Sequence, residues 1–282
     1  MTAVICTSDE QYYPLLRIMI KSIACNSPNV YVFVRLVNCD RSCEADLQQI
    51  YRNVEVMFDS KELCTKRKKL QRSGAPLQDE MFNVYKLCDN KDRFRGAKWL
   101  YSEKMAYCSN IKYNTINMLF DRDVENVLYM DADAIVRKPL DELIKLSSNY
   151  DISMFMETDK GICSGAVDPA CIPTTDYYDR RDNTTWVEWH AGLFVVRNNN
   201  KMKRFFYELE QAITDPTELY DWEADQVLFN DQYQKVKSDI TVYSLPRKFK
   251  DEQFSDSSVV WCGAGEHKFQ TERFIEEQQI YA

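Results

Sequence analysis

The chain has 282 residues, with 36 Lys and Arg against 44 Asp and Glu, and a formal net charge of −8 at pH 7. Its 45% hydrophobic and 28% charged residues can bury a substantial core, which excludes a disordered or collagen-like protein. An acidic chain has no extended positive field for nucleic acid, so a phosphorylated ligand would need a metal ion or a few lysines. Only 7 glycines are present, with no GxGxxG or GxxxxGKS/T motif, which argues against a dinucleotide site and a P-loop.

The N-terminal part of the chain alternates short apolar runs with amphipathic runs. Strands, rich in β-branched and aromatic residues, alternate with helices that carry apolar residues at helical spacing. They are a strand at 3–7, a helix at 12–24, a strand at 31–37, a helix at 43–52 and a strand at 54–58. This order predicts an α/β fold with a mainly parallel central sheet flanked by helices, and ligands beyond the carboxyl ends of its strands.

The stretch 61–98 is polar and irregular, and it begins with a cluster of basic residues that we interpret as a solvated surface or as a patch facing an anionic acceptor. After it, regular elements resume without a repeat or a low-complexity linker, so one continuous domain over 1–282 is expected. The elements are helices at 98–119, 141–146, 201–213 and 222–230, and strands at 126–130, 151–156, 192–197, 241–245 and 258–262.

The ten cysteines are scattered, with no CxxC pair and no Cys/His spacing typical of zinc. The N-terminus MTAVICTSDE has neither the basic nor the apolar region of a signal peptide, and no run of about 18 apolar residues occurs. A soluble, cytoplasmic protein with free thiols is therefore expected, and the glycosylation sequon at Asn183 is then a chance match.

The most informative motif is Asp131-Ala132-Asp133, directly after the apolar strand 126–130. Two carboxylates one residue apart on a chain that leaves a sheet can both reach a divalent ion, and oxygen ligands suit Mg²⁺ or Mn²⁺. Such an ion neutralises a pyrophosphate both when bound and when it departs as a leaving group. The alternative is a pair of turn or helix-cap aspartates.

The segment VLYMDADAIVRKPLDEL closely resembles the metal-binding segment of nucleotide-sugar glycosyltransferases with the GT-A fold. The nearest resemblance is to family 8, which includes glycogenin and bacterial lipooligosaccharide galactosyltransferases. Other segments match in the same order, over most of the chain except 59–98 and 157–186. The resemblance implies a single Rossmann-like GT-A domain, with a nucleotide-binding half at 1–130 and a metal, sugar and acceptor half at 131–282. Ala132 would lie against the donor.

For the donor nucleotide, the family has a Thr-x-x-Asp-x-x-Tyr-like stretch at the end of its first strand. Thr7, Asp9 and Tyr12 are similar to it and are expected to hold the base, on which an aromatic ring can stack. The family also carries an Arg or Lys that contacts the diphosphate, some residues before the metal aspartates. Lys112 matches that position best, and Lys104 is the alternative.

For the donor sugar, the segment WHAGLFVVRN resembles the family's Asn-Ala-Gly strand, where the small pair lets the sugar approach the backbone. Ala191 and Gly192 supply that pair, and His190 stands where Asn is commoner. The segment EADQVLFN resembles the GDQxxLN motif. The resemblance implies that Asp225 orients the sugar and steadies the oxocarbenium-like centre, while Gln226 lies beneath the anomeric carbon.

At the C-terminal end the match is weaker. The family pattern is His-Phe-x-Gly-x-x-Lys-Pro-Trp, whose His is the third metal ligand and whose Lys binds the diphosphate. Trp261 is aligned with that His, and after a one-residue insertion Gly265 and Lys268 preserve the Gly-x-x-Lys spacing. His267 is then the expected replacement for the missing ligand, and imidazole favours Mn²⁺ over Mg²⁺.

The sequence therefore predicts a glycosyltransferase that uses Mn²⁺ (or Mg²⁺) and a nucleoside-diphosphate sugar, with a UDP-sugar favoured, to glycosylate a hydroxyl of a glycan, protein or small acceptor. Retention of anomeric configuration follows from the resemblance alone. Two alternatives stay open: a DxD phosphotransferase or phosphatase with a phosphorylated Asp, and a sugar-nucleotide-binding protein without turnover. Acceptor stacking is a further hypothesis for the aromatic residues Tyr177, Tyr178, Trp186 and Trp189.

Overall fold

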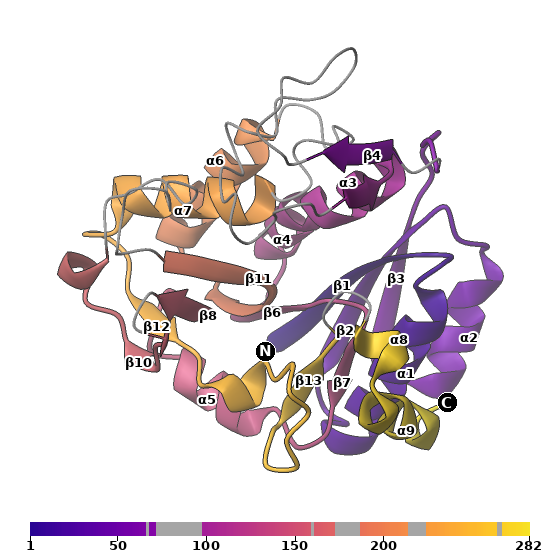
Figure 1. Ribbon diagram of the computed structural model, residues 1–282. Coiled ribbons are helices and arrows are strands. Elements are labelled where there is room, and N and C mark those ends of the chain that lie inside the picture. Colours follow the sequence, from indigo (N-terminus) through magenta and orange to yellow (C-terminus); the bar gives the residue numbers. More distant parts are fainter. Residues whose placement is uncertain (66–67, 72–97, 159–160, 173–186, 214–223, 264–266) are drawn as a thin grey trace.

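The structure is a computed structural model of the chain, and it forms a mixed α/β fold (Figure 1). It describes residues 1–65, 68–71, 98–158, 161–172, 187–213, 224–263 and 267–282. The expected fold class, an α/β protein with a central sheet between layers of helices, is confirmed.

The central sheet has the strand order β10-β12-β8-β11-β6-β1-β2-β3, and β9 pairs with β8. The run β6-β1-β2-β3 is parallel, as is the β8–β12 pair, whereas β11 lies antiparallel between β6 and β8. The strands are β1 (Thr2–Asp9), β2 (Tyr31–Val37), β3 (Val54–Asp59), β6 (Asn126–Met130), β8 (Ile152–Thr158), β9 (Gly161–Ile162), β10 (Gly165–Ala166), β11 (Val187–Arg197) and β12 (Val242–Ser244).

Helices cover both faces of this sheet (Figure 1). Helices α3, α4, α6 and α7 lie on one side, and α1, α2 and α5 on the other. Their bounds are α1 (Tyr13–Asn26), α2 (Ser42–Ile50), α3 (Glu103–Asn110), α4 (Lys112–Phe120), α5 (Asp141–Ser147), α6 (Asn200–Ala212) and α7 (Ala224–Val236), with short 3₁₀ turns at Pro169–Cys171 and Arg247–Phe249.

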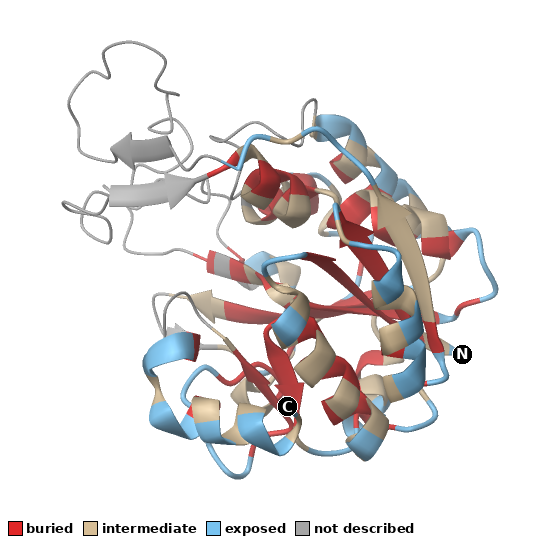
Figure 2. Cartoon of the chain, turned by 90° about the vertical axis from the view of Figure 1, so that its right-hand side faces the viewer, coloured by how far each residue is buried: buried red, intermediate tan, exposed pale blue. Residues whose placement is uncertain are grey.

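Strand β6 shows how the alternation of side chains builds two cores. Val127 and Tyr129 pack with α4, α6 and α7, whereas Leu128 and Met130 pack with α1 and α5. All four are buried, because a central strand is covered on both faces and successive side chains point to opposite ones (Figure 2). The strand is therefore fixed where Asp131 leaves the sheet.

Most of the expected elements are confirmed to within a few residues, but the single helix expected at 98–119 is wrong. Residues Lys98–Tyr101 form strand β5, paired with β4 (Lys68–Gln71). Helix α3 begins only after Ser102, whose Oγ accepts from the Met105 N–H at 3.2 Å, a helix cap that separates strand from helix. Helicity is interrupted again at Ile111, before α4.

A second, two-stranded sheet lies beyond the central one and was not expected as a unit. Strand β7 (Ala134–Val136) follows the two aspartates directly and pairs antiparallel with β13 (Val260–Cys262). Helices α8 (His267–Gln270) and α9 (Glu272–Ile280) follow β13. This pairing brings the C-terminal segment beside Asp131 and Asp133.

Within the described ranges, none of the helices combines the length and apolarity that crossing a bilayer requires. Eight of the cysteines in those ranges are free thiols.

Asp151 joins three parts of the fold and provides a test of it. Its carboxylate accepts from the Thr241 N–H at 2.8 Å, the Thr241 hydroxyl at 3.0 Å and the Asn199 side chain at 2.7 Å. Replacing Asp151 by Ala removes three part-buried hydrogen bonds to a carboxylate and should lower the free energy of unfolding by about 2–4 kcal/mol. Chemical denaturation measures this. As control, Asp256→Ala removes a carboxylate that is 81% exposed and should lower the free energy of unfolding by less than about 0.5 kcal/mol. Equal losses of stability in the two variants would contradict the structural role of Asp151.

Candidate functional site

Asp131 is held in a fixed place at the end of β6. Its backbone N–H donates to the Gly192 carbonyl at 2.9 Å, and its carbonyl accepts from the Ala134 N–H at 3.1 Å, which turns the chain. The Tyr129 hydroxyl donates to Asp131 Oδ1 at 2.9 Å. The carboxylate is therefore oriented before any ligand arrives.

Burial raises the pKa of Asp131 from 3.8 to about 6. Lys112 opposes this rise, whereas the negative charge of Asp133 adds to it. At neutral pH the Asp131 carboxylate is ionised in a poorly solvated environment, which destabilises its negative charge. A cation bound beside it would therefore be stabilised.

Asp133, two residues later, is paired with a lysine from the far end of the chain. Lys268 Nζ lies 2.5 Å from Asp133 Oδ2 and 3.3 Å from the Tyr12 hydroxyl. The other carboxylate oxygen, Oδ1, is buried and has no hydrogen-bond partner among the described residues. A metal ion or a hydrogen-bond donor would satisfy this oxygen.

Two glycines press against these carboxylates. A Cβ on Gly192 would lie 2.6 Å from Asp131 Oδ2, and a Cβ on Gly263 would lie 3.0 Å from the Asp133 carboxylate. A Cβ at either position would crowd the carboxylate that it meets, so glycine at both positions leaves these carboxylates in place.

These residues fit a hard divalent cation of the kind the sequence predicts. The fit rests on the desolvated carboxylate of Asp131, the buried carboxylate of Asp133 and the orphaned Oδ1 of Asp133. Within the described ranges, no group of three or more His, Cys, Asp and Glu side chains is arranged to hold a metal. The two aspartates would therefore leave most of the coordination shell to other oxygen ligands.

A second buried ion pair lies next to the small residues of β11. Lys112 Nζ is 2.7 Å from Asp225 Oδ2 and 3.2 Å from the Ala191 carbonyl, which accepts from it. The Tyr113 hydroxyl donates to the Asp225 carbonyl. The Gln226 N–H donates to Asp225 Oδ1 at 2.9 Å. The structure thus brings Lys112, Asp225, Gln226 and Ala191 together.

The end of β1 forms the expected turn into α1. Thr7 and Asp9 are buried, and Asp9 Oδ1 accepts from the Tyr12 N–H at 2.9 Å. Lys104 Nζ lies 3.2 Å from Asp9 Oδ2 and 2.7 Å from Glu10 Oε1. Lys104 therefore braces this turn, and Lys112, rather than Lys104, lies with Asp225.

His190 lies beside a lysine that sequence reasoning missed. Lys250 Nζ is 3.4 Å from His190 Nδ1, and the ammonium also pairs with Glu252. The pKa of Lys250 is raised because Cys262, Glu252 and Asp131 outweigh the opposing effect of burial, which is the largest single contribution. In the sequence Lys250 belongs to the charged run KFKDEQ, which is typical of a solvated loop, so no signal separates it from its neighbours.

The structure corrects the expected alignment of Trp261 with the family's metal histidine. Trp261 is buried with Phe254 and Phe274, and its ring N–H donates to the Ser255 carbonyl at 2.8 Å. Because side chains alternate along β13, Cys262 instead lies in the core that contains Leu128 and Met130. Burial raises the pKa of its thiol, and the negative charge of nearby Asp133 raises it further. Counting back six residues from Lys268, as the family pattern requires, gives Cys262 without any insertion.

Several expected residues cannot be placed. Gly265 and the side chain of His267 lie outside the described residues, as do Tyr177, Tyr178 and Trp186. Trp189 is fully buried against Phe229 and Tyr233, so it is a core residue and not a surface for acceptor stacking.

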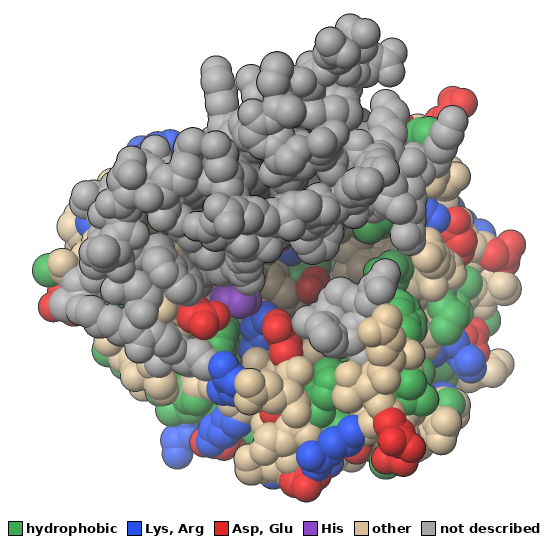
Figure 3. Space-filling model, viewed as in Figure 1, with side chains coloured by type: hydrophobic (Ala, Val, Ile, Leu, Met, Phe, Trp, Pro, Cys, Tyr) green, Lys and Arg blue, Asp and Glu red, His purple; other side chains and the backbone are tan. Residues whose placement is uncertain are grey.

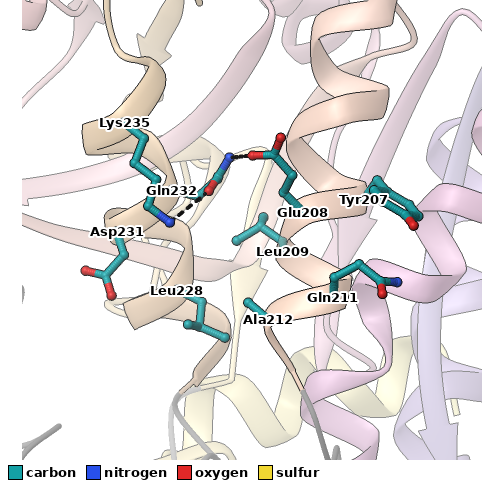
Figure 4. A pocket seen from close by; sticks show the side chains of 9 residues that line it. All are labelled: Tyr207, Glu208, Leu209, Gln211, Ala212, Leu228, Asp231, Gln232 and Lys235. Carbon is teal, nitrogen blue, oxygen red and sulfur yellow. Dashed lines mark hydrogen bonds between the residues drawn. The ribbon is translucent and has the colours of Figure 1, made fainter.

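Charged side chains gather around a histidine in the middle of the face shown in Figure 3. A separate pocket of about 360 Å³ lies between α6 and α7 (Figure 4), and none of its lining residues belongs to the predicted site.

Three solved structures with a similar fold are glycosyltransferases. GlyE of Streptococcus pneumoniae TIGR4 has a TM-score of 0.52 and 12% identity; the match covers 99% of this chain but only 59% of the GlyE chain. The galactosyltransferase LgtC, solved with donor and acceptor sugar analogues, has a TM-score of 0.51 and 13% identity, covering 99% and 95%. The bifunctional enzyme WbbM has a TM-score of 0.51 and 14% identity, covering 98% and 49%.

The fold is therefore that of these glycosyltransferases, the GT-A type. The model of the family described as glycosyl transferase family 8 matches residues 3–252. The chain belongs to that family. No curated protein matches the chain.

The raised pKa of Asp131 has a consequence for stability. Because the folded state binds this proton more tightly, the folded form carries a penalty that is complete above pH 6 and absent below pH 3.8. In metal-free buffer, Asp131→Asn should raise the free energy of unfolding at pH 7.5 by up to about 3 kcal/mol, and the gain should shrink between pH 6 and pH 4. Thermal denaturation measures this, and a variant less stable than wild type at pH 7.5 would contradict it.

The corrected alignment predicts that histidine restores a metal ligand at one position only. Cys262→His should tighten Mn²⁺ binding by about tenfold or more, since imidazole coordinates Mn²⁺. Trp261→His is the matched control: it should not change Mn²⁺ affinity, and it should lose about 3–5 kcal/mol of stability by emptying a packed site. Isothermal titration with Mn²⁺ compares them, and tighter binding in Trp261→His alone would restore the original alignment.

Proposed function

We propose that this protein transfers a sugar from a nucleoside-diphosphate sugar, with a UDP-sugar favoured, to a hydroxyl of a glycan, protein or small acceptor, and that the transfer depends on Mn²⁺ or Mg²⁺. One arrangement carries the proposal. Asp131, Asp133, Lys268 and Tyr12 meet where β1 and β6 end, although they come from widely separated parts of the sequence. Ligands of such sheets bind at the carboxyl ends of the strands.

In this proposal the first half of the chain, 1–130, binds the nucleotide. The ring of Tyr12 stacks on the base, and the turn held by Asp9 places that ring. Thr7 is buried at the end of the same strand. Lys268, whose ammonium lies 4.6 Å from the centre of the Tyr12 ring, is placed to move from Asp133 to the diphosphate.

The second half, 131–282, holds the metal and the sugar. Asp131 and Asp133 would hold the cation, which would supply positive charge to the departing diphosphate. Gly192 leaves room for the sugar against the backbone. Asp225, fixed by Lys112, provides negative charge near the anomeric carbon as the glycosyl–phosphate bond breaks, and Gln226 follows it on α7. We propose retention of configuration on family grounds only.

The two alternative functions have less support. The phosphorylated-aspartate mechanism has no support from the family match. A donor-binding protein without turnover remains the second candidate, because within the described ranges no third protein ligand stands beside Asp131 and Asp133. A soluble, cytoplasmic setting stays a prediction of the sequence.

The test is a thermal-shift panel of UDP-, GDP- and TDP-sugars with and without Mn²⁺, followed by donor hydrolysis. One nucleotide should raise the melting temperature only with Mn²⁺, since a ligand of the folded state stabilises it. Asp131→Asn should abolish the shift and the turnover. No shift with any sugar nucleotide would contradict the function, and a shift without turnover under any condition would favour the second candidate.

Lys268 gives a more specific prediction. Lys268→Met should weaken binding of the donor by about 10–100-fold, because a charge-assisted contact to phosphate is lost. Mn²⁺ alone should bind at least as well as in wild type, since Asp133 loses its competing ammonium. Lys248→Met, at a surface lysine paired with Glu142, is the control and should change neither affinity. Titration calorimetry measures both, and unchanged donor affinity in Lys268→Met would contradict the role.

A further inference from the structure

The pocket between α6 and α7 has a volume of about 360 Å³ and lies outside the catalytic arrangement (Figure 4). Cavities of about 300 Å³ and more are large enough for small ligands. Residues four apart share a helix face, so Tyr207 and Gln211 of α6, and Leu228 and Gln232 of α7, form its walls. The two helices pack against each other, which fixes the shape of the pocket before a ligand binds.

The pocket has an apolar part that is continuous with the core. Leu209 is buried in the core on this side of the sheet, and Leu228 packs against the same core. Tyr207, on the same pocket, is 58% exposed, although a large aromatic residue gains free energy when it is covered. A ligand with an apolar face would therefore be stabilised against Tyr207 and the two leucines.

Polar side chains line the same pocket and are held in place by one another. The Gln232 side-chain N–H donates to Glu208, and Lys235 Nζ donates to Gln232 Oε1 at 3.4 Å. Glu208 Oε1 also accepts from Arg204 Nε at 2.8 Å. Figure 4 shows this row of hydrogen bonds across the gap between the helices. The row places amide, ammonium and carboxylate groups side by side, so the pocket offers both donors and acceptors.

The charges of the lining residues narrow the chemical class of the ligand. Glu208 and Asp231 supply two carboxylates and Lys235 supplies one ammonium, so a phosphate or another anion is disfavoured. A wholly apolar ligand, such as a lipid chain, would remove water from these groups without replacing its hydrogen bonds. A neutral sugar matches both parts of the pocket, because the C–H groups on one side of its ring can cover Tyr207 and its hydroxyls donate and accept.

We propose that the α6–α7 pocket is a second carbohydrate-binding site, which holds a neutral oligosaccharide and anchors it as the acceptor. Helix α7 connects this pocket with the catalytic arrangement: Asp225 lies in its first turn, Leu228 about one turn further, and Lys235 about three turns further. An acceptor of several sugar units that is bound here keeps its free end at a high local concentration near Asp225. The anchoring role rests on the proposed function, whereas the binding of an oligosaccharide does not.

The first experiment measures binding without donor and without metal. Neutral hexasaccharides of glucose, galactose, mannose, xylose and N-acetylglucosamine are titrated into the full chain, and binding is followed by ligand-observed NMR. At least one should bind, and Tyr207→Ala should weaken its binding by about tenfold or more, because the ring that it covers is lost. Tyr207→Phe keeps the ring and should stay within about threefold of wild type.

Two exposed glutamines provide a matched pair for the polar contacts. Gln211→Ala removes an amide of the pocket and should weaken binding by about threefold or more. Gln279→Ala removes an exposed amide on α9 and should leave binding unchanged. The substituted side chains are exposed, so the variants should fold as wild type does, which circular dichroism checks. The second site is overturned if none of the hexasaccharides binds, or if Tyr207→Ala binds them as wild type does.

A second copy of the chain is the other occupant that this pocket could have. Sedimentation velocity of wild type and Tyr207→Ala without sugar distinguishes it. The proposal predicts the same mass for both proteins. A dimer in wild type that Tyr207→Ala dissociates would assign the pocket to contact between copies, and it would overturn the carbohydrate site.

The anchoring role is tested with the donor that the thermal-shift panel selects. Wild type should have a KM for the hexasaccharide that binds at least about tenfold below its KM for the matching monosaccharide, since a second contact raises the local concentration of the acceptor. Tyr207→Ala should remove most of this difference, and Gln279→Ala should keep it. Equal KM values for the two acceptors in wild type overturn the anchoring.

These measurements keep the two proposals apart. If no sugar nucleotide binds, the proposed function fails and the anchoring role fails with it, while the hexasaccharide titration still decides whether the second site exists. If a sugar nucleotide binds and is turned over but no hexasaccharide binds at Tyr207, the proposed function stands and this inference alone is overturned.

Discussion

The buried ion pair between Lys268 and Asp133 joins parts of the chain that are 135 residues apart, and the rest of the site depends on it. It brings the segment after β13 against the end of β6, and Tyr12 from the first strand–helix turn joins the same ammonium. Without it, Asp133 would be a second uncompensated anion beside Asp131. Breaking such a pair is costly, because it leaves a charge buried and alone.

The site concentrates features that a protein selected only for stability would avoid. Asp131 has a pKa raised by loss of solvation, and Asp133 keeps an oxygen without a hydrogen-bond partner among the described residues. The Lys112–Asp225 pair is also buried. Such costs are typical of functional sites, where groups are held ready for a ligand that completes them. The surrounding core, built on both faces of β6, offsets these costs.

The sequence predicts the fold well where local patterns decide it. The alternating strands and helices from β1 to β3, and the apolar strand before the two aspartates, are read from residue spacing and were confirmed. The change from strand to helix at Ser102 was missed, because the apolar spacing of this run is typical of one continuous helix and hides the cap inside it. The β7–β13 pair was missed because its partners are far apart along the chain.

The residues of the candidate site likewise differ in whether the sequence alone can propose them. The motif residues from Asp131 to Lys268 could be proposed from spacing and resemblance, and the structure brings those it describes into contact. Lys250 could not, because its burial depends on the tertiary position of the loop that carries it. Trp261 and Cys262 differ by one position in sequence but face opposite sides of β13, and only the pairing with β7 decides which side faces Asp133.

The most direct test of this account is a crystal structure with Mn²⁺ and the selected sugar nucleotide, with manganese located by its anomalous scattering. The account predicts one manganese ion contacting Asp131 and Asp133, with Lys268 turned from Asp133 to the diphosphate. A nucleotide bound elsewhere, or bound here with no manganese and the Lys268–Asp133 pair intact, would contradict it.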